Sequence, residues 1–312
     1  MPGALRPRRP LVELCGAVRF GRADATACRG APALTRACLI AAAALALQVQ
    51  PPVFRTGVEV VAVDVSVTRG NAPVTGLTAQ DFKLTDEGVE QTIESVTLDR
   101  LPLSVTLVLD TSLSVSGNRL ANLIQAGNGL LSELRGTDRA SLITFSHVVE
   151  RPVPMTGDFD VIRHALSTLT GSGSTSLRDA VQLAVELSPR DKSRPLILVF
   201  TDGADTTSWL NGPAVLDTAR RADVVVHVVT LEEHPFLEQL THETGGRVWS
   251  ATSDRQLHDL FTRAIDEMRA RYVLTFTPSG VKKPGWHELK VRLARARGDV
   301  TARPGYFVAE RR

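Results

Sequence analysis

The most informative part of the sequence reads Ser104-Val105-Thr106-Leu107-Val108-Leu109-Asp110-Thr111-Ser112-Leu113-Ser114. Its first six residues form a nearly continuous apolar run that is bounded by polar residues. A strand in a parallel sheet covered by helices is buried on both faces, so it has this composition instead of an alternating one. The stretch therefore predicts a central strand of a parallel sheet, followed directly by a polar loop.

The segments after this strand alternate between helical and strand patterns. Helices are predicted at residues 120–134, 159–169, 177–187, 213–221 and 253–271, and strands at 140–145, 196–200 and 224–229. The pair Gly245-Gly246 is expected to end a further helix, with an edge strand starting at Arg247. Strands that alternate with helices predict an α/β fold with a doubly wound, mostly parallel sheet.

Both flanks of this region have β patterns instead. The predicted strands are residues 58–67, 81–88 and 91–98 before it, and 272–277, 286–293 and 306–308 after it. Each group is too small to be a stable sheet alone, so we expect the two groups to pair in a small β module. The chain then divides into a leader at 1–47, an N-terminal β segment at 55–102, the α/β domain at 103–271 and a C-terminal β segment at 272–312.

Three loops of the predicted α/β domain carry oxygen ligands. Asp110, Ser112 and Ser114 follow the central strand, Thr175 lies in a Gly/Ser loop that leads into a helix, and Asp202 follows the strand at 196–200. Ligands of doubly wound sheets bind at the carboxyl ends of the strands, where these loops lie. Hydroxyl and carboxylate oxygens suit Mg²⁺ or Mn²⁺. With two nearby anions, such a cation keeps positive charge for a carboxylate from a partner protein.

At these residues the chain resembles the von Willebrand factor type A family. Its metal-ion-dependent adhesion site combines an Asp-x-Ser-x-Ser strand end with a distant Thr and a distant Asp. Asp110, Ser112 and Ser114 match the first loop, Thr175 the second and Asp202 the third. Over residues 103–271 the resemblance implies a site for Mg²⁺ or Mn²⁺, with Ca²⁺ as a third option. It also implies recognition of an acidic residue on a protein partner, and a binding protein instead of an enzyme.

The flanks are similar to those of a group of bacterial exported proteins built around this domain. The similar segments are 74–78 with Asp81-Phe82, and Tyr272-Val273-Leu274 with Gly305-Tyr306-Phe307. One departure from the family is Leu113, where a small residue such as Gly is commoner, and it is expected to restrict access to the metal. Trp209, in the loop after Asp202, is a candidate for a partner contact or for loop packing.

Two other classes of function remain open at this point. The hydroxyls and carboxylates could cap helices in a metal-independent structural or assembly module of an envelope complex. A metal-dependent hydrolase is the third class, although the sequence has neither a Gly-x-Ser-x-Gly nor a His-Glu-x-x-His motif. The loop Gly171-Ser172-Gly173-Ser174 has no following Lys, so it does not match a phosphate-binding loop.

The N-terminal region has the features of an export signal. Arg36 precedes an apolar run, residues 37–47, which ends in an Ala-Leu-Ala type cleavage pattern. A disordered tail followed by a short core helix is the alternative. The cysteines are Cys15, Cys28 and Cys38, so a processed chain has no disulfide, no thiolate zinc site and no cysteine nucleophile. We expect a secreted or periplasmic protein whose mature chain has no stable membrane span.

Charge and composition exclude one class of partner. The chain has 312 residues, 43% hydrophobic residues and a formal net charge of +2. Seven arginines against two acidic residues lie in residues 1–47, so the rest of the chain is mildly acidic. It has no basic stripe and no basic residues interleaved with aromatics, which a nucleic-acid-binding protein would need.

Overall fold

The α/β part of the protein is built on one six-stranded sheet. The computed structural model describes residues 60–308 apart from 71, 99–100 and 282. The strand order is β11-β10-β9-β6-β7-β8, parallel except for β8, which is antiparallel to β7. The strands are β6 (Leu103–Asp110), β7 (Arg139–Phe145), β8 (Val149–Thr156), β9 (Arg194–Thr201), β10 (Val225–Thr230) and β11 (Val248–Ser250).

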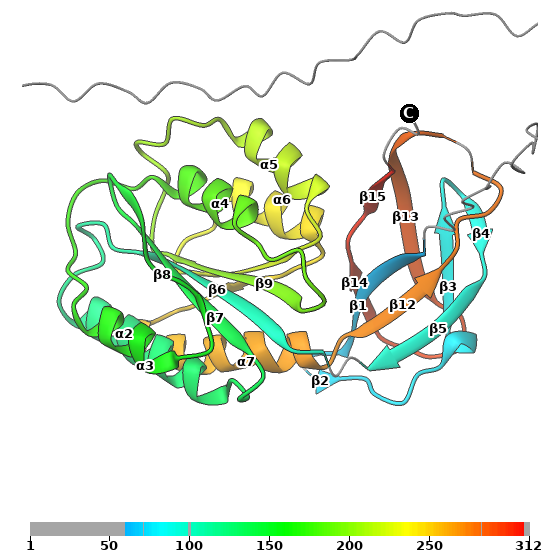
Figure 1. Ribbon diagram of the computed structural model, residues 1–312, viewed down its shortest axis with the longest axis horizontal. Helices are drawn as coiled ribbons and strands as arrows, with labels where there is room; N and C mark the ends of the chain where they lie inside the picture. The colour runs from blue at the N-terminus through cyan, green and yellow to red at the C-terminus, as the bar shows by residue number, and fades with distance from the viewer. Residues whose placement is uncertain (1–59, 71, 99–100, 282, 309–312) are drawn as a thin grey trace, which may run out of the picture. The chain divides into compact units, whose positions relative to one another are not determined.

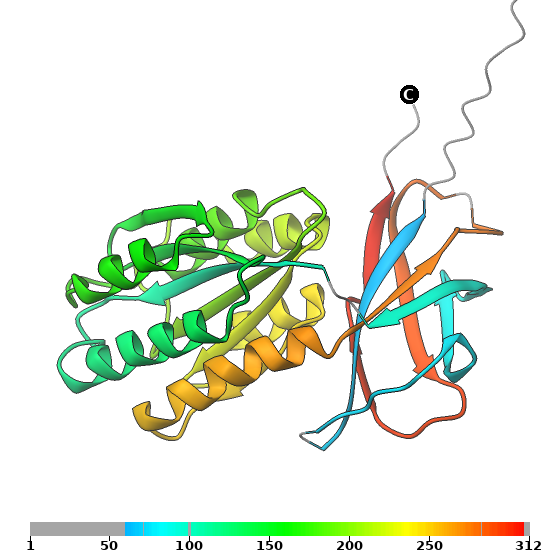
Figure 2. The same cartoon turned by 60° about the horizontal axis from the view of Figure 1, so that its bottom comes forward.

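Helices cover both faces of this sheet (Figures 1 and 2). One face packs against α2 (Asn118–Glu133), α3 (Phe159–Ser167) and α7 (Leu257–Arg269). The other packs against α4 (Leu177–Glu186), α5 (Gly212–Arg221) and α6 (Pro235–Thr244). The prediction of a doubly wound, mostly parallel α/β sheet is confirmed.

The position of β6 in the middle of the sheet explains why its sequence is so apolar. All eight residues of β6 are buried, because β7 and β9 flank it and both of its faces meet helices. The chain continues from β6 to β7 on one side and later returns to β9 on the other side. The gap beyond the carboxyl ends of β6 and β9 is therefore the topological switch point, where doubly wound folds bind ligands.

The edge strand β8 was not predicted. Its sequence contains Pro152 and Pro154, which weaken a strand pattern because proline cannot donate a backbone hydrogen bond. At the edge of a sheet this loss is tolerated, and β7 is the only described strand with which β8 pairs. The predicted end of a helix at Gly245 is confirmed, since Gly245 closes α6 in the left-handed conformation with φ 71°. The predicted edge strand after it is β11.

The remaining strands form the β module, which has a five-stranded and a four-stranded sheet. The first has the order β14-β1-β12-β5, with β2 also pairing with β1, and the second has the order β15-β13-β3-β4. The N-terminal members are β1 (Val61–Arg69), β2 (Ala72–Pro73), β3 (Phe82–Asp86), β4 (Val89–Gln91) and β5 (Ile93–Leu98), with a short 3₁₀ helix, η1 (Ala79–Asp81), before β3. The C-terminal members are β12 (Tyr272–Phe276), β13 (Gly285–Leu293), β14 (Asp299–Ala302) and β15 (Gly305–Val308).

Strands from the two flanks are neighbours in both sheets of the β module. β1 pairs with β12 and β14, and β3 pairs with β13. Side chains from the two sheets share one apolar core, which includes Val63, Leu84, Leu274 and Leu289. The prediction that the flanking strands build one β module is confirmed. β14 was not predicted.

A buried group of charged residues connects α7 with the β10–β11 region and the start of β12. The Arg247 backbone N–H donates to His227 Nδ1 (3.1 Å), so His227 Nε2 carries the proton and donates to Glu267 Oε2 (2.7 Å). Arg271, which is fully buried, donates to Glu267 Oε1 (3.0 Å) and to the carbonyl of Gly245 (2.7 Å). Burial alone would raise the pKa of Glu267, but Arg271 and His227 hold it well below its ordinary value.

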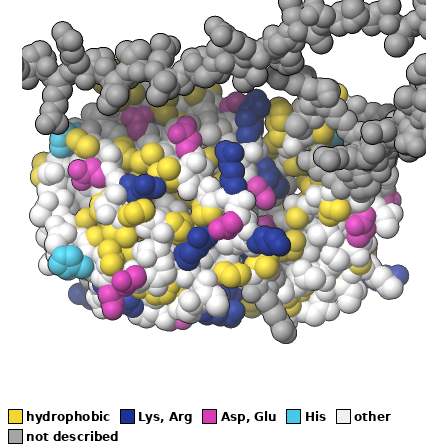
Figure 3. Space-filling model, in the orientation of Figure 1, with side chains coloured by type: hydrophobic (Ala, Val, Ile, Leu, Met, Phe, Trp, Pro, Cys, Tyr) yellow, Lys and Arg dark blue, Asp and Glu magenta, His cyan; other side chains and the backbone are white. Residues whose placement is uncertain are grey.

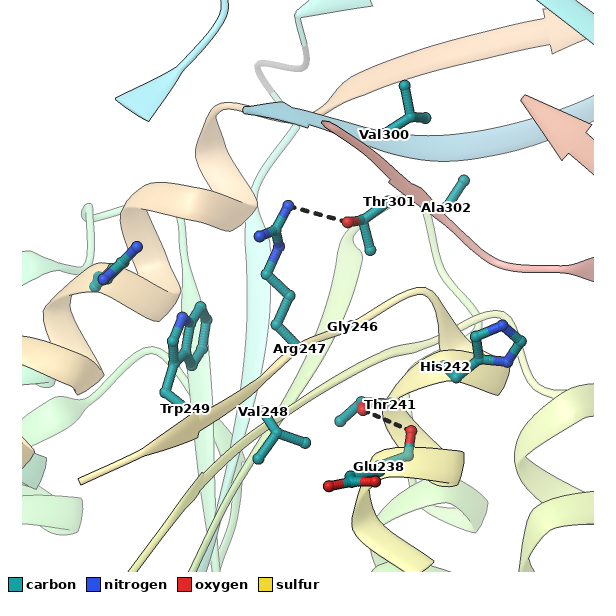
Figure 4. A pocket seen from close by; sticks show the side chains of 11 residues that line it. Glu238, Thr241, His242, Gly246, Arg247, Val248, Trp249, Val300, Thr301 and Ala302 are labelled. Atoms are coloured by element: carbon teal, nitrogen blue, oxygen red, sulfur yellow. Dashed lines mark hydrogen bonds between the residues drawn. The ribbon is translucent and has the colours of Figure 1, made fainter. Parts of the chain in front are cut away.

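The Arg247 side chain links the α/β domain to the β module directly. Figure 4 shows it reaching from the start of β11 to Thr301 of β14. Its Nη2 donates to Thr301 Oγ1 (3.0 Å) and to Thr68 Oγ1 of β1 (3.2 Å). A cavity of about 570 Å³ lies beside this contact, with Trp249 and His242 in its wall.

Charged side chains of both signs are interspersed on the face drawn in Figure 3. Within residues 60–308, the undescribed positions excepted, no helix is both long enough and apolar enough to cross a membrane. The predicted leader and signal peptide at 1–47, with all the cysteines, lie outside the described residues.

Candidate metal centre

Asp110 is the last residue of β6 and forms the floor of the candidate site. It is fully buried. Its Oδ1 accepts the backbone N–H of Ser112 (2.8 Å), and its Oδ2 accepts the hydroxyl of Thr201 at the end of β9 (2.7 Å). These two bonds fix the carboxylate at the switch point between the strands.

Next to Asp110, the side-chain oxygens of three further residues form a hydrogen-bonded chain: Ser112, Ser114 and Asp202. Ser112 Oγ lies 3.1 Å from Ser114 Oγ, and the Ser114 hydroxyl donates to Asp202 Oδ1 (2.9 Å). Ser112 is bonded to Asp110 through its backbone. The structure thus brings together four of the five residues that the sequence predicted as metal ligands.

Thr175, the fifth, lies on the adjoining loop. Two backbone hydrogen bonds join that loop to the Asp-x-Ser-x-Ser loop. Leu113 N–H donates to the carbonyl of Gly173 (3.0 Å), and Ser172 N–H donates to the carbonyl of Thr111 (2.8 Å). The Thr175 backbone N–H donates to Thr206 Oγ1 (3.0 Å). Within the described part of the chain, the Thr175 hydroxyl makes no hydrogen bond to the other four residues.

Glycine is required where these two loops meet. A Cβ atom on Gly171 would lie 2.3 Å from the carbonyl oxygen of Val115, and Gly173 has φ +74°, which side-chain-bearing residues rarely adopt. The Gly/Ser composition of this loop therefore reflects close packing against the Asp-x-Ser-x-Ser loop.

The electrostatics of the floor favour a cation. Burial raises the pKa of Asp110, and the nearby Asp202 raises it further, while hydrogen bonds from Ser112 and Thr201 oppose the shift. A buried carboxylate beside another one is costly to ionise unless a positive charge compensates it. A cation held at the serine hydroxyls would supply that compensation.

The donor set decides which metals suit the site. Among the described residues, no three His, Cys, Asp or Glu side chains gather in a group that could hold a metal. The oxygens available here are hydroxyls and two carboxylates, which are hard ligands. Mg²⁺ and Mn²⁺ match this chemistry better than Zn²⁺ or copper, which favour nitrogen and sulfur.

Arg119 is a residue of the site that sequence reasoning missed. It forms an ion pair with Asp202 Oδ2, and its Nη1 also donates to the backbone carbonyl of Ser114 (3.3 Å). Its Nε lies 3.2 Å from Asp254 Oδ1, in the short 3₁₀ helix η2 (Asp254–Gln256) before α7. No signal in the sequence pointed to it, because the helix was predicted at 120–134, whereas α2 begins at Asn118 and so includes Arg119 in its first turn.

Two exposed apolar side chains belong to the loops of the site. Leu113 is 68% exposed and Trp209 is 96% exposed, so neither packs into its own loop. The Trp209 loop is fixed by its backbone, since Asp179 of α4 accepts the N–H groups of Trp209 (2.9 Å) and Leu210 (3.0 Å). Of the two roles expected for Trp209, loop packing is therefore wrong.

Comparison with known families assigns this region to the family that the site residues resemble. Residues 105–204 match the family model described as the von Willebrand factor type A domain. The chain contains a von Willebrand factor type A domain. The matched residues run from β6 to the loop after β9 and so include every predicted ligand.

Curated relatives extend the comparison beyond this domain. The chain is 24% identical to inter-alpha-trypsin inhibitor heavy chain H4 of Bos taurus over 208 residues, which is 59% of this chain and 23% of that protein. It is 33% identical to the uncharacterized protein sll0103 of Synechocystis over 110 residues, which is 33% of this chain and 26% of that protein. The alignments thus span about a quarter of the length of these relatives.

Among solved structures, the chain is similar to a von Willebrand factor type A protein from Catenulispora acidiphila. The sequence identity is 11%, the TM-score is 0.48, and the match covers 78% of this chain and 76% of that one.

Proposed function

We propose that the von Willebrand factor type A domain of this protein binds a partner protein outside the cytoplasm through one divalent cation. Ser112, Ser114 and Thr175 would hold Mg²⁺ or Mn²⁺, and Asp110 and Asp202 would hold it directly or through water. The main support is the chain of oxygens from Ser112 through Ser114 to Asp202, which starts beside the buried Asp110 at the switch point.

The chemistry of the ligands accounts for the kind of partner. Hydroxyl groups are neutral, so the two carboxylates are the only anions that this ligand set offers the cation. A cation bound in this way remains attractive to a further carboxylate. An Asp or Glu side chain of the partner supplies one, and the exposed Leu113 and Trp209 offer apolar contact area beside it.

Export and the lack of enzymatic activity belong to the same proposal. Export rests on the apolar run at 37–47 after Arg36. Intact mass of the protein recovered from the medium or periplasm tests it, because a cleaved chain lacks the leader. A binding role without catalysis rests on the sequence, which has neither a Gly-x-Ser-x-Gly nor a His-Glu-x-x-His motif.

A metal-independent assembly module is the second candidate. One observation favours it: Ser114 and Arg119 already satisfy the Asp202 carboxylate. In that case these contacts only fix the loops, and partner binding does not depend on a cation.

Calorimetric titration of Mg²⁺ and Mn²⁺ into the purified protein distinguishes the two candidates. We expect saturable binding that Asp110→Asn and Thr175→Ala each weaken at least about tenfold, because each removes an oxygen ligand or its charge. Matched controls are Thr92→Ala, in the β module, and Asp160→Asn, which change exposed residues away from the site. Both should bind as the wild type does.

Two results would change the assignment. Absence of binding to the wild-type protein, even with an acidic peptide present, would favour the assembly module. Metal-dependent turnover of p-nitrophenyl phosphate that Asp110→Asn abolishes would instead favour a hydrolase.

A further inference from the structure

Arg119 occupies a position where a helix does not favour a positive charge. Helix α2 begins at Asn118 after Gly117, so Arg119 lies in its first turn, and that turn has no acidic residue. The amino end of a helix carries a partial positive charge, which repels a guanidinium group. Contacts of Arg119 with acidic side chains offset this repulsion.

One of these contacts is with the candidate metal ligand Asp202. The carboxylate of Asp202 is nearly inaccessible, with a side chain that is 1% exposed, and Arg119 forms its only ion pair among the described residues. The same guanidinium donates to the Ser114 carbonyl (3.3 Å) and pairs with Asp254 (3.2 Å). One side chain of the protein thus places a positive charge directly against the site.

We propose that Arg119 is a built-in cation that competes with the divalent metal for Asp202 and so sets the affinity of the site. This inference rests on the proposed metal-dependent function. Two cations that share one buried carboxylate repel each other strongly, because little solvent screens them. The metal therefore binds with full strength only when Arg119 releases Asp202.

The structure provides a place for the released side chain. A cavity of about 540 Å³ adjoins Arg119 and is also lined by Glu233, Ser250 and Asp254. Asp254 already binds the Nε of Arg119, and the exposed Glu233 carboxylate is a second anion in the same cavity. Rotation of the Arg119 side chain toward Glu233, with the contact to Asp254 kept, would release Asp202.

Competition and a purely structural ion pair predict different metal affinities. If Arg119 competes, removing it strengthens metal binding, whereas a residue that only orders the loop would weaken binding when removed. The variant Arg119→Gln therefore decides the direction. Arg255→Gln is its matched control, because Arg255 is an exposed neighbour of Asp254 and its loss changes the net charge equally.

The experiment is calorimetric titration of Mg²⁺ into wild-type, Arg119→Gln, Arg119→Lys and Arg255→Gln proteins, each checked for folding by circular dichroism. We expect Arg119→Gln to bind at least about tenfold more tightly than the wild type. Arg255→Gln should match the wild type. Arg119→Lys, which keeps the charge but is too short to contact both carboxylates, should lie between them.

Chemical rescue provides a second readout. Methylguanidinium added to Arg119→Gln should return the Mg²⁺ affinity toward the wild-type value. The same concentration of NaCl should not, and wild-type protein should respond equally to both salts.

The outcomes separate this inference from the proposed function. Equal or weaker Mg²⁺ binding by Arg119→Gln, with binding by the wild type intact, overturns the competition and leaves the metal site standing. Binding by Arg119→Gln alone supports both. If neither protein binds Mg²⁺ or Mn²⁺, the proposed metal site itself is wrong and the competition with it.

Discussion

Asp138 shows how one buried carboxylate can join distant parts of the α/β domain. Its side chain is 1% exposed. Oδ1 accepts the backbone N–H of Leu103 at the start of β6 (2.9 Å). Oδ2 accepts the N–H of Arg135 (2.7 Å) and pairs with Arg269 at the end of α7 (2.6 Å). Burial opposes ionisation, but these hydrogen bonds outweigh it and lower the pKa of Asp138 below its ordinary value of 3.8.

Asp138 therefore gives the stability a defined pH dependence. A carboxylate whose pKa is lower in the folded state stabilises fully above its ordinary pKa, and this contribution is lost as the pH falls through the folded pKa. We expect Asp138→Asn to reduce the free energy of unfolding by about 2–3 kcal/mol at pH 7. The difference from the wild type should shrink below pH 4, as followed by urea denaturation.

The exposed Asp160, with a side chain that is 93% exposed, supplies the control, and Asp160→Asn should change the stability by less than about 0.5 kcal/mol. A loss from Asp138→Asn that stays constant down to pH 3 would contradict this role of the charge.

At the same scale, the sequence could predict the short side chains of the site but not the long one. Asp110, Ser112 and Ser114 follow a buried strand closely, so the end of that strand fixes where they lie. Thr175 and Asp202 were predicted from the family resemblance and from their positions. Thr175 lies in a Gly/Ser loop, and Asp202 follows a predicted strand. Arg119 reaches Asp202 across 83 residues of sequence. It lies just outside the helix predicted at 120–134, so nothing in the sequence separates it from the other arginines.

Among the described glycines, Gly246 leaves the least room for a Cβ atom, and it lies in the connection between α6 and β11. A Cβ atom on Gly246 would lie 1.7 Å from the carbonyl oxygen and 2.6 Å from the carbonyl carbon of Val226 in β10. Both are backbone atoms, so no side-chain rotation relieves the clash. The connection can approach β10 this closely only with glycine at this position.

We therefore expect Gly246→Ala to destabilise the protein by about 2–3 kcal/mol, because β11 must move away from β10. Gly136→Ala is the control, since a Cβ atom there meets no other atom within 4 Å, and its effect should stay within about 0.5 kcal/mol. Guanidinium denaturation monitored by tryptophan fluorescence measures both. Equal stability of the two variants would show that β11 adapts.

The elements that the sequence predicted well are those whose burial leaves a periodic pattern. β6, β9 and the helices on the sheet bury whole faces, and their apolar residues recur accordingly. β8 and β14 lie at sheet edges, where burial is partial and prolines or polar residues are tolerated. Their pairing is decided by neighbours distant in the sequence, which local patterns do not contain.

On the scale of the whole α/β domain and β module, stability depends on the buried group around Glu267. Arg271 is fully buried and ends the α7 region just before β12. We expect Arg271→Met to cost about 3–5 kcal/mol, because Glu267 would lose its main counter-charge in a buried site. The exposed pair Lys290–Glu288 gives the comparison, and Lys290→Met should cost less than about 1 kcal/mol.

Differential scanning calorimetry measures this prediction. The wild-type protein should unfold in a single transition if the buried group couples the two parts, and Arg271→Met should broaden or split it. An Arg271→Met protein as stable as Lys290→Met would show that the charges contribute nothing to coupling.

The chain leaves the β module after β5 and returns to it in β12, and these two strands are paired with Leu98 opposite Tyr272. Residues directly opposite each other in antiparallel strands are only about 4.5–5.5 Å apart. The α/β domain is therefore inserted between β5 and β12, at the position where a tight hairpin turn would otherwise connect the two strands. Recombination or gene design could exchange the whole α/β domain at this point, and the β module would keep every strand pair it now has.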